Sequence, residues 1–350
     1  MLNSDPMGRP LRRSRSEPGI IYTFYSYKGG VGRTMALVNV GVLLALTGTG
    51  ENSRPRVLLV DWDLEAPGLD TYFELIGASN KSSNYRAKPG VVDLLESQSK
   101  GESLSWRDCL NRVSFTEGDL DFISSGRKEI SQASAADYGT RVQQLNWARL
   151  FEEHNIGNYW NRVRQEWIDE YDYVLVDSRT GYTDIGDICT VLLADVLVLC
   201  FVTNYQNVRG IDQALKRARQ ARDALPVDRS RLIAVPVGMR DEIYNERAKA
   251  LEWRGIYVKE LGYLFKEWLP ASVTPEEAIN QLFVPYVPIV SFGERIPVLE
   301  HIRERVDPTS IGSACATCEP NPHPTGLGGE LRRRRRADGT EGFGTRNRED

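Results

Sequence analysis

A glycine-rich segment from Lys28 to Thr34 constrains the fold of this 350-residue chain more than any other feature. It follows a β-branched and aromatic run at residues 20–25 and precedes an apolar run at residues 35–46. Phosphate binding requires glycines whose backbone N–H groups surround an anion, a cation for the phosphate oxygens and a hydroxyl for Mg²⁺. A tight surface turn, the simpler alternative, would need neither flanking run. The sequence therefore predicts a strand, a phosphate-binding loop and a buried helix in that order.

Two later apolar runs end in aspartates. Residues 57–60 lead into Asp61 and Asp63, and residues 173–176 lead into Asp177. Isolated carboxylates at strand ends are often merely solvated, but the ligands of open α/β sheets bind at the carboxyl ends of the strands. Together with the loop, the three aspartates favour a binding site over a solvated surface.

The alternation of apolar strands with helical segments predicts the fold class. It favours a doubly wound α/β protein with a mostly parallel sheet and helices on both faces. We expect a flexible arm at residues 1–19, one domain at residues 20–302 with a helical excursion at about 240–282, and a disordered Arg/Gly/Pro-rich tail at residues 303–350. A reading-frame artefact would change the composition as abruptly as a natural tail does, so both origins stay open.

The composition excludes several classes of protein. The formal net charge of −4 gives no global attraction to nucleic acid or to acidic membranes. The longest apolar run, residues 191–202, contains Asp195 and is too short to cross a bilayer. The odd number of cysteines, five, argues against a secreted disulfide framework and favours a cytoplasmic protein. Cys315, Cys318 and His323 offer too few ligands for a structural zinc site.

Two positions of the loop depart from the standard Walker pattern G-x-x-x-x-G-K-S/T, since Tyr27 and Arg33 replace its first glycine and its lysine. The segment resembles instead the deviant Walker A loop, K-G-G-x-G-K-S/T, of the MinD/ParA family of P-loop ATPases. Residues 57–63 and 173–181 resemble the acidic motifs of that family. The resemblance covers about residues 20–302 and implies a P-loop NTPase fold of the MinD/ParA type.

The resemblance implies roles for the residues of the loop. Lys28 is expected to be catalytic and to reach across a dimer interface to the partner's nucleotide, whereas Arg33 contacts the phosphates in its own subunit. The hydroxyl of Thr34 is expected to ligate Mg²⁺. The residues expected to bind the nucleotide are Lys28, Gly29, Gly30, Val31, Gly32, Arg33, Thr34, Met35 and Gly181.

The same resemblance implies roles for the aspartates. Asp61 is expected to lie near the metal and Asp177 to hold Mg²⁺ through water. Asp63, the second catalytic residue, orients or deprotonates the attacking water, and Gly181 senses the γ-phosphate. Phosphoryl transfer is catalysed mainly by positioning and by charge neutralisation, so these residues form a sufficient set.

The implied cofactors are ATP and Mg²⁺. The guanine-reading motif N-K-x-D is absent from the predicted strand end at residues 235–241, so we expect adenine rather than guanine. Arg240 at this strand end either stacks on the base or faces solvent.

The implied partners are a second copy of the chain, in a nucleotide-dependent homodimer, and an unidentified protein; no membrane contact is expected. DNA is a weaker candidate, because the basic residues of the predicted helix at 212–225 more often form a solvated face. These residues are Lys216, Arg217, Arg219 and Arg222.

The leading hypothesis is a slow ATPase that acts as a dimerisation switch in partition, in positioning, or in a regulatory or defence role. The alternative is a nucleotide-binding interaction module with little or no turnover. Arg33 keeps this alternative open, because a planar guanidinium cannot occupy the compact position of an ammonium group. A bacterial-type tyrosine kinase is disfavoured, since residues 303–350 contain no tyrosine.

Overall fold

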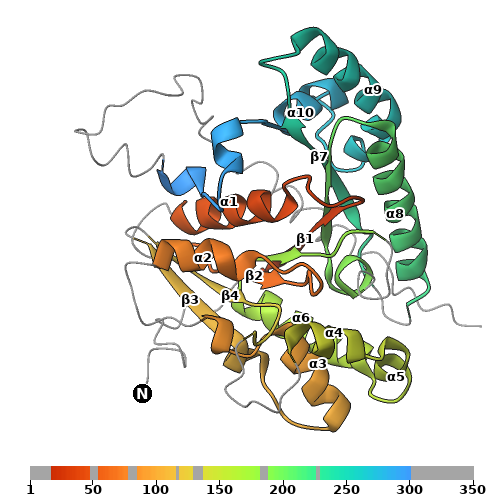
Figure 1. The fold of residues 1–350 in the computed structure, drawn as a ribbon. Helices are drawn as coiled ribbons and strands as arrows, with labels where there is room; N and C mark the ends of the chain where they lie inside the picture. The colour runs from red at the N-terminus through yellow and green to blue at the C-terminus, as the bar shows by residue number, and fades with distance from the viewer. Residues whose placement is uncertain are drawn as a thin grey trace, which may run out of the picture. The chain divides into compact units, whose positions relative to one another are not determined.

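The structure is a computed structural model of the chain (Figure 1). It describes residues 17–47, 54–77, 85–115, 118–128, 137–181, 188–225 and 229–300. The predicted tail at residues 303–350, with the cysteine pair and the basic run, lies outside the described residues, as do residues 1–16 of the predicted arm.

Within the described ranges, eight strands form one sheet, in the order β3-β4-β2-β5-β1-β6-β7-β8. Their bounds are β1 (Ile20–Ser26), β2 (Val57–Asp61), β3 (Leu110–Phe115), β4 (Gly118–Ile123), β5 (Tyr173–Asp177), β6 (Val196–Phe201), β7 (Ile233–Asp241) and β8 (Phe283–Pro285). The strand pairs β2–β4, β2–β5, β6–β7 and β7–β8 are parallel, whereas β3 and β4 are antiparallel. The predicted α/β fold with a mostly parallel sheet is confirmed.

The chain forms two compact units. Unit 1 contains Met1–Tyr22 and Val40–Asp177, and unit 2 contains Thr23–Asn39 and Ser178–Asp350. Strand β1 and helix α1 (Arg33–Leu46) each contribute residues to both units. The single domain expected at residues 20–302 stays a prediction.

Unit 1 combines its strands with five described α-helices and two short 3-10 helices. These are α2 (Leu69–Gly77), α3 (Val91–Lys100), α4 (Tyr138–Gln144), α5 (Trp147–Glu152), α6 (Ile156–Glu170), η1 (Tyr85–Ala87) and η2 (Trp106–Cys109). The apolar positions Trp160, Val163 and Trp167 recur at helical spacing along α6 and are buried. The Trp160 ring meets Trp62, which follows β2, edge to face at a centroid distance of 4.5 Å. Burial of this aromatic cluster fixes α6 against the end of β2.

Unit 2 combines β6, β7 and β8 with two described helices of 19 residues, α8 and α9, and three shorter ones. These are η3 (Ile188–Leu193, a π-helix), α8 (Tyr205–Asp223), α9 (Arg247–Phe265), α10 (Pro275–Gln281) and the 3-10 helix η4 (Pro288–Ser291). Helices α8 and α9 lie side by side (Figure 1), and α9 and α10 occupy the predicted helical excursion. Tyr257 of α9 packs on Phe201 of β6 at a centroid distance of 4.7 Å. None of the helices in the described ranges is long and apolar enough to cross a membrane.

Candidate functional site

The glycine-rich segment forms the turn between β1 and α1, as predicted. Gly30 and Gly32 have φ angles of 74° and 91°, in the left-handed region that side chains rarely adopt. A Cβ atom added at Gly30 would meet no atom within 4 Å, so the backbone angle, rather than crowding, requires glycine there. The turn leads directly into α1. At the start of this helix, the N–H of Ala36 donates a hydrogen bond to the carbonyl of Gly32 at 3.0 Å.

Arg33 is the first residue of α1 and is only 5% exposed. Its Nη1 lies 3.5 Å from the hydroxyl of Ser26 at the end of β1. The first turn of a helix carries unpaired backbone N–H groups and a positive dipole end, and the guanidinium adds a full charge there. This end of α1 therefore favours an anion such as a phosphate. Thr34 and Met35 follow in the same turn and are half-buried.

A pocket of about 600 Å³ lies beside the loop within unit 2. Its wall includes Lys28 and Gly29 of the loop, the end of β7 at Arg240 and the ring of Trp253 on α9. Pockets for small ligands commonly have volumes of this size. Lys28 is exposed, and its Nζ donates a hydrogen bond to Oε1 of Gln206 in the first turn of α8. The phosphate-type loop thus adjoins a cavity large enough for a nucleotide.

Two amide side chains of the pocket wall have orientations that the hydrogen bonds determine. Oδ1 of Asn204, which caps α8, accepts from the backbone N–H of Asn207 at 2.9 Å. A backbone N–H can only donate, so the second group on that oxygen, Nδ2 of Asn207 at 2.9 Å, is also a donor. Oδ1 of Asn207 therefore points elsewhere; it is buried and accepts no hydrogen bond within the described part of the chain.

Asn207 was not among the residues predicted from the sequence. An asparagine before an apolar-spaced helix is a recognisable cap signal, and it marks Asn204. No local pattern marks Asn207, whose importance depends on the folded pocket. The structure therefore adds a buried acceptor to the predicted site.

Arg240 also lies in the pocket wall, and its backbone is unusual. Its φ angle of 55° is in the left-handed region, which is uncommon for a residue with a side chain. The guanidinium lies 4.8 Å from the ring centroid of Tyr286, and Nη1 donates to the carbonyl of Gly30 at 3.3 Å. Arg240 thus links the end of β7 to the loop. The choice between its two expected roles, stacking on a base and facing solvent, stays open.

Asp61 and Asp177 lie together in unit 1. They end the parallel strands β2 and β5 opposite one another in register, and both are fully buried. The two oxygens of Asp61 accept from the backbone N–H groups of Asp63 and Leu69, each at 3.2 Å. Burial, followed by the charge of Asp177, raises the pKa of Asp61 from 3.8 to about 8. Two buried carboxyl groups in this arrangement are suited to a hard cation such as Mg²⁺.

Asp63 lies two residues beyond the end of β2 and is 8% exposed. Its Oδ1 accepts from the backbone N–H of Ala66 at 3.4 Å. The residue between the two aspartates, Trp62, donates its backbone N–H to the carbonyl of Asp177 at 2.9 Å. These bonds bring the three predicted aspartates of unit 1 together, and their burial excludes the alternative of solvated strand-end carboxylates.

The remaining predicted residues belong to unit 2. The loop residues Lys28 to Met35 lie there, and so does Gly181, whose φ angle is 78°. Within the described ranges, no group of three or more His, Cys, Asp or Glu residues could hold a metal by itself. A metal at Asp61 and Asp177 would therefore need further oxygen ligands from water, from a hydroxyl or from a bound phosphate.

Two of the basic residues of α8, Arg219 and Arg222, bind other parts of the chain. Arg219 pairs with Glu267 and donates to the carbonyl of Leu232 at 2.9 Å. Arg222 is 5% exposed and donates to the carbonyl of Ala194 at 2.6 Å. Neither residue contributes to a solvated basic face. Lys216 is exposed and pairs with Asp212 one turn earlier in α8.

The comparison with protein-family models gives no match, and the comparison with curated protein sequences gives none. Solved structures do match. A complex of a Cyanothece McdA variant with ATP has a TM-score of 0.50 at 15% identity and covers 86% of this chain and 100% of its own. MinD from Pyrococcus horikoshii with Mg-ADP has a TM-score of 0.48 at 15% identity, with coverages of 85% and 100%. ParA of pNOB8 bound to nonspecific DNA has a TM-score of 0.48 at 16% identity, with coverages of 91% and 99%.

At this level of identity the likeness to McdA concerns the fold. The chain has the fold of MinD/ParA-type P-loop ATPases over most of its length. The expected P-loop NTPase fold is confirmed.

Proposed function

We propose that this chain, which has the fold of MinD/ParA-type P-loop ATPases, is a Mg-ATP-dependent switch that dimerises when it binds ATP and is reset by slow hydrolysis. The observation that carries the proposal is the loop between β1 and α1. Its left-handed glycines open a helix whose first residue is a buried arginine, and a pocket of about 600 Å³ adjoins it. The McdA structure of the same fold is a complex with ATP, which supports this choice of ligand.

The loop would bind the phosphates. The backbone N–H groups from Gly29 to Thr34 would surround the phosphate oxygens, and Arg33 would neutralise their charge from within its own subunit. Thr34, Asp61 and Asp177 would hold Mg²⁺, whose preference for oxygen ligands matches this donor set. When bound, the metal supplies charge neutralisation on the phosphate oxygens.

Asp63 would orient the attacking water. Its carboxylate is held close to the end of β2 by the hydrogen bond with Ala66. A carboxylate so placed can accept a proton from water as the oxygen attacks phosphorus, and Gly181 would respond to the γ-phosphate. Hydrolysis would remove the terminal phosphate and reset the switch.

The pocket would select adenine over guanine. The buried Oδ1 of Asn207 lacks a donor within the described chain, and the 6-amino group of adenine could supply one. Guanine carries an oxygen at that position, which would leave two acceptors facing each other. A site with a buried polar group discriminates strongly against a ligand that leaves it unpaired.

Lys28 would act in the homodimer. It is exposed at the pocket rim, and in the MinD/ParA resemblance its charge serves the nucleotide of the opposite subunit. Its contact with Gln206 would have to break for that reach. The closed dimer would then be recognised by a protein partner or by DNA, in the cytoplasm. DNA would have to use residues other than Arg219 and Arg222, which are committed within the chain.

One observation favours the alternative of a binding module with little turnover. The guanidinium of Arg33 is buried and lies 3.5 Å from the hydroxyl of Ser26. A planar group fixed in this way binds phosphate oxygens well but adapts less than a lysine as charge moves during the reaction. We therefore expect tight binding and slow turnover.

Phosphate release under multiple-turnover conditions, with and without DNA, tests the proposal. The parent should release phosphate from Mg-ATP slowly but catalytically, whereas Asp63→Ala should bind Mg-ATP as the parent does and release none above background. Binding without release in the parent would favour the interaction module. Absence of Mg-ATP binding in the parent would refute both functions.

A further inference from the structure

Two helices that follow β4 in the chain, α4 and α6, contact the loop that carries Asp63. The carbonyl of Leu64, the residue after Asp63, accepts a hydrogen bond from the hydroxyl of Tyr138 at 2.9 Å. On the other side of Asp63, the ring of Trp62 packs on Trp160 of α6. These contacts lie within unit 1, and they hold the residues on both sides of the aspartate.

Tyr138 is the first residue of α4, a helix of only seven residues. So short a helix has little stability of its own, and its position depends on its anchors. Asp137 caps it by accepting the N–H of Thr140 at 3.0 Å. Arg141 lies three residues after Tyr138, which places the two side chains on the same side of the helix. The anchor of Arg141 therefore fixes the hydroxyl of Tyr138 as well.

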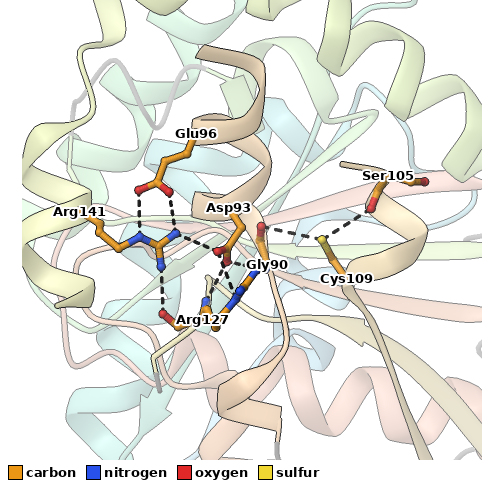
Figure 2. Close-up of polar contacts among 7 residues, drawn as sticks. All are labelled: Gly90, Asp93, Glu96, Ser105, Cys109, Arg127 and Arg141. Atoms are coloured by element: carbon orange, nitrogen blue, oxygen red, sulfur yellow. Dashed lines mark hydrogen bonds and ion pairs between the residues drawn. The ribbon is translucent and has the colours of Figure 1, made fainter. Parts of the chain in front are cut away.

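Figure 2 shows how Arg141 is anchored. Its guanidinium binds Glu96 of α3 through two bonds of 2.9 Å and Asp93 through a third of 2.9 Å. Nη1 donates to the carbonyl of Arg127 at 3.1 Å. Asp93 also accepts the backbone N–H groups of Gly90 and Arg127, each at 2.9 Å. Arg141 and Asp93 are each 8% exposed, so this ion pair is largely desolvated, and its charge-assisted bonds fix the guanidinium.

The ring of Tyr138 is also fixed by its surroundings. Gly126, next to Arg127, has a φ angle of 156°, and a Cβ added there would lie 3.1 Å from the ring edge of Tyr138. The glycine therefore leaves the space that the ring needs. A series of contacts leads from α3 through Arg141 and Tyr138 to the carbonyl beside Asp63.

We propose that Tyr138 is a positioning residue for Asp63, anchored by Arg141 and the carboxylates of α3. This role rests on the proposed function. It accounts for the buried cluster, which the nucleotide site by itself does not explain. Tyr138 touches neither nucleotide nor metal in this role; it restricts the loop so that the carboxylate of Asp63 keeps one orientation. Loss of the hydroxyl would widen the range of orientations and slow the reaction without changing the binding of the nucleotide.

The test compares Tyr138→Phe with a matched control, Tyr159→Phe. Each substitution removes one phenolic hydroxyl from a helix of unit 1: Tyr138 belongs to α4 and Tyr159 to α6. The hydroxyl of Tyr159 is buried and makes no hydrogen bond within the described residues, so its removal breaks none. A difference between the variants therefore reports the contacts of the Tyr138 hydroxyl, with the carbonyl of Leu64 and with the side chain of Ser125.

The first measurement is amide hydrogen exchange without nucleotide. In Tyr138→Phe the N–H groups of Asp63 and Ala66 should exchange about fivefold faster than in the parent, as expected for loss of one ordinary hydrogen bond. Tyr159→Phe should leave both rates unchanged. Equal rates in the two variants would overturn the proposal.

The second measurement is turnover of Mg-ATP. Tyr138→Phe should lower kcat about fivefold or more with an unchanged KM, while the control keeps both. An unchanged kcat with faster exchange would overturn the role in positioning Asp63. If the parent itself shows no turnover, the exchange result still decides whether Tyr138 restrains the loop, and it is the proposed hydrolysis that fails.

Discussion

Asp61 and Asp177 face each other in register at the carboxyl ends of β2 and β5, and neither side chain is exposed. Burial disfavours the charged form of a carboxyl group, and a neighbouring negative charge disfavours it further. The pKa of Asp61 is accordingly raised to about 8, by burial and then by the charge of Asp177. Near neutral pH the ligand-free protein keeps a proton that Mg²⁺ would displace.

This proton predicts a pH dependence of stability. The folded pKa of about 8 lies above the ordinary value of 3.8, so between these values the folded state binds more protons than the unfolded state. The contribution of Asp61 to the free energy of unfolding is therefore complete below pH 3.8 and declines as the pH rises toward about 8. The slope reaches at most about 1.4 kcal/mol per pH unit.

Chemical denaturation of the parent and of Asp61→Asn across this pH window checks the prediction. The parent should lose stability with rising pH relative to the variant, which has no proton to lose at that position. Saturating Mg-nucleotide should flatten the parent's profile, because the metal replaces the proton. Parallel profiles for parent and variant would show that Asp61 is ionised in the ligand-free protein.

The base assignment predicts a change of nucleotide preference. Asn207→Leu removes the buried acceptor and keeps the number of side-chain heavy atoms, so the Kd for ATP should rise about tenfold, within the range for loss of one specific contact, while the Kd for GTP changes little. Titration calorimetry with both nucleotides measures the ratio. Gln165→Leu, which removes an amide from the exposed surface of α6, is the control and should leave both values as in the parent. An unchanged ratio in Asn207→Leu would separate Asn207 from base recognition.

The cluster around Arg141 predicts a large loss of stability. Arg141→Leu removes the closer of the two cations beside the buried carboxylate of Asp93, at 2.9 Å, and leaves Arg127 at 3.5 Å. It should cost about 3 kcal/mol of unfolding free energy, as is usual when one partner of a buried ion pair is removed. Arg149→Leu breaks an ion pair with Glu153 whose side chains are 62% and 56% exposed, and should leave stability within experimental error. Urea unfolding of both variants makes the comparison. Similar midpoints would mean that Arg141 is not a structural anchor.

The fold and the centre of the candidate site were accessible from the sequence because local chemistry requires them. Only glycine adopts the φ angles of Gly30 and Gly32 readily, so the glycines in the sequence indicate a loop of this kind. Fully apolar strands that end in aspartates identify β2 and β5 for a similar reason. Asp61, Asp63 and Asp177 are accordingly found together.

The other features depend on contacts between distant segments. Arg219 pairs with Glu267, and Tyr138 donates to the carbonyl of Leu64. Neither contact produces a periodic pattern in the sequence. A basic residue on a helix looks the same in sequence whether it meets solvent, DNA or a buried carboxylate. The acceptor of Asn207, which has no partner among the described residues, likewise exists only once its helix has been capped and packed.

The central claim, a nucleotide-dependent dimer, rests on two cations that flank the same glycines but serve different subunits. Lys28 is exposed at the pocket rim, whereas Arg33 is buried at the start of α1. Arg33→Ala should therefore weaken nucleotide binding at every protein concentration. Lys28→Ala should bind nucleotide as the parent does but fail to dimerise, because its charge-assisted contact forms only between two subunits.

Light scattering with a slowly hydrolysed ATP analogue tests this most directly. We expect the parent to change from monomer to dimer when Mg²⁺ and the analogue are added, and Lys28→Ala to remain a monomer at concentrations that saturate its site. A parent that stays monomeric in every nucleotide state, or a Lys28→Ala protein that dimerises as tightly as the parent, would contradict the switch.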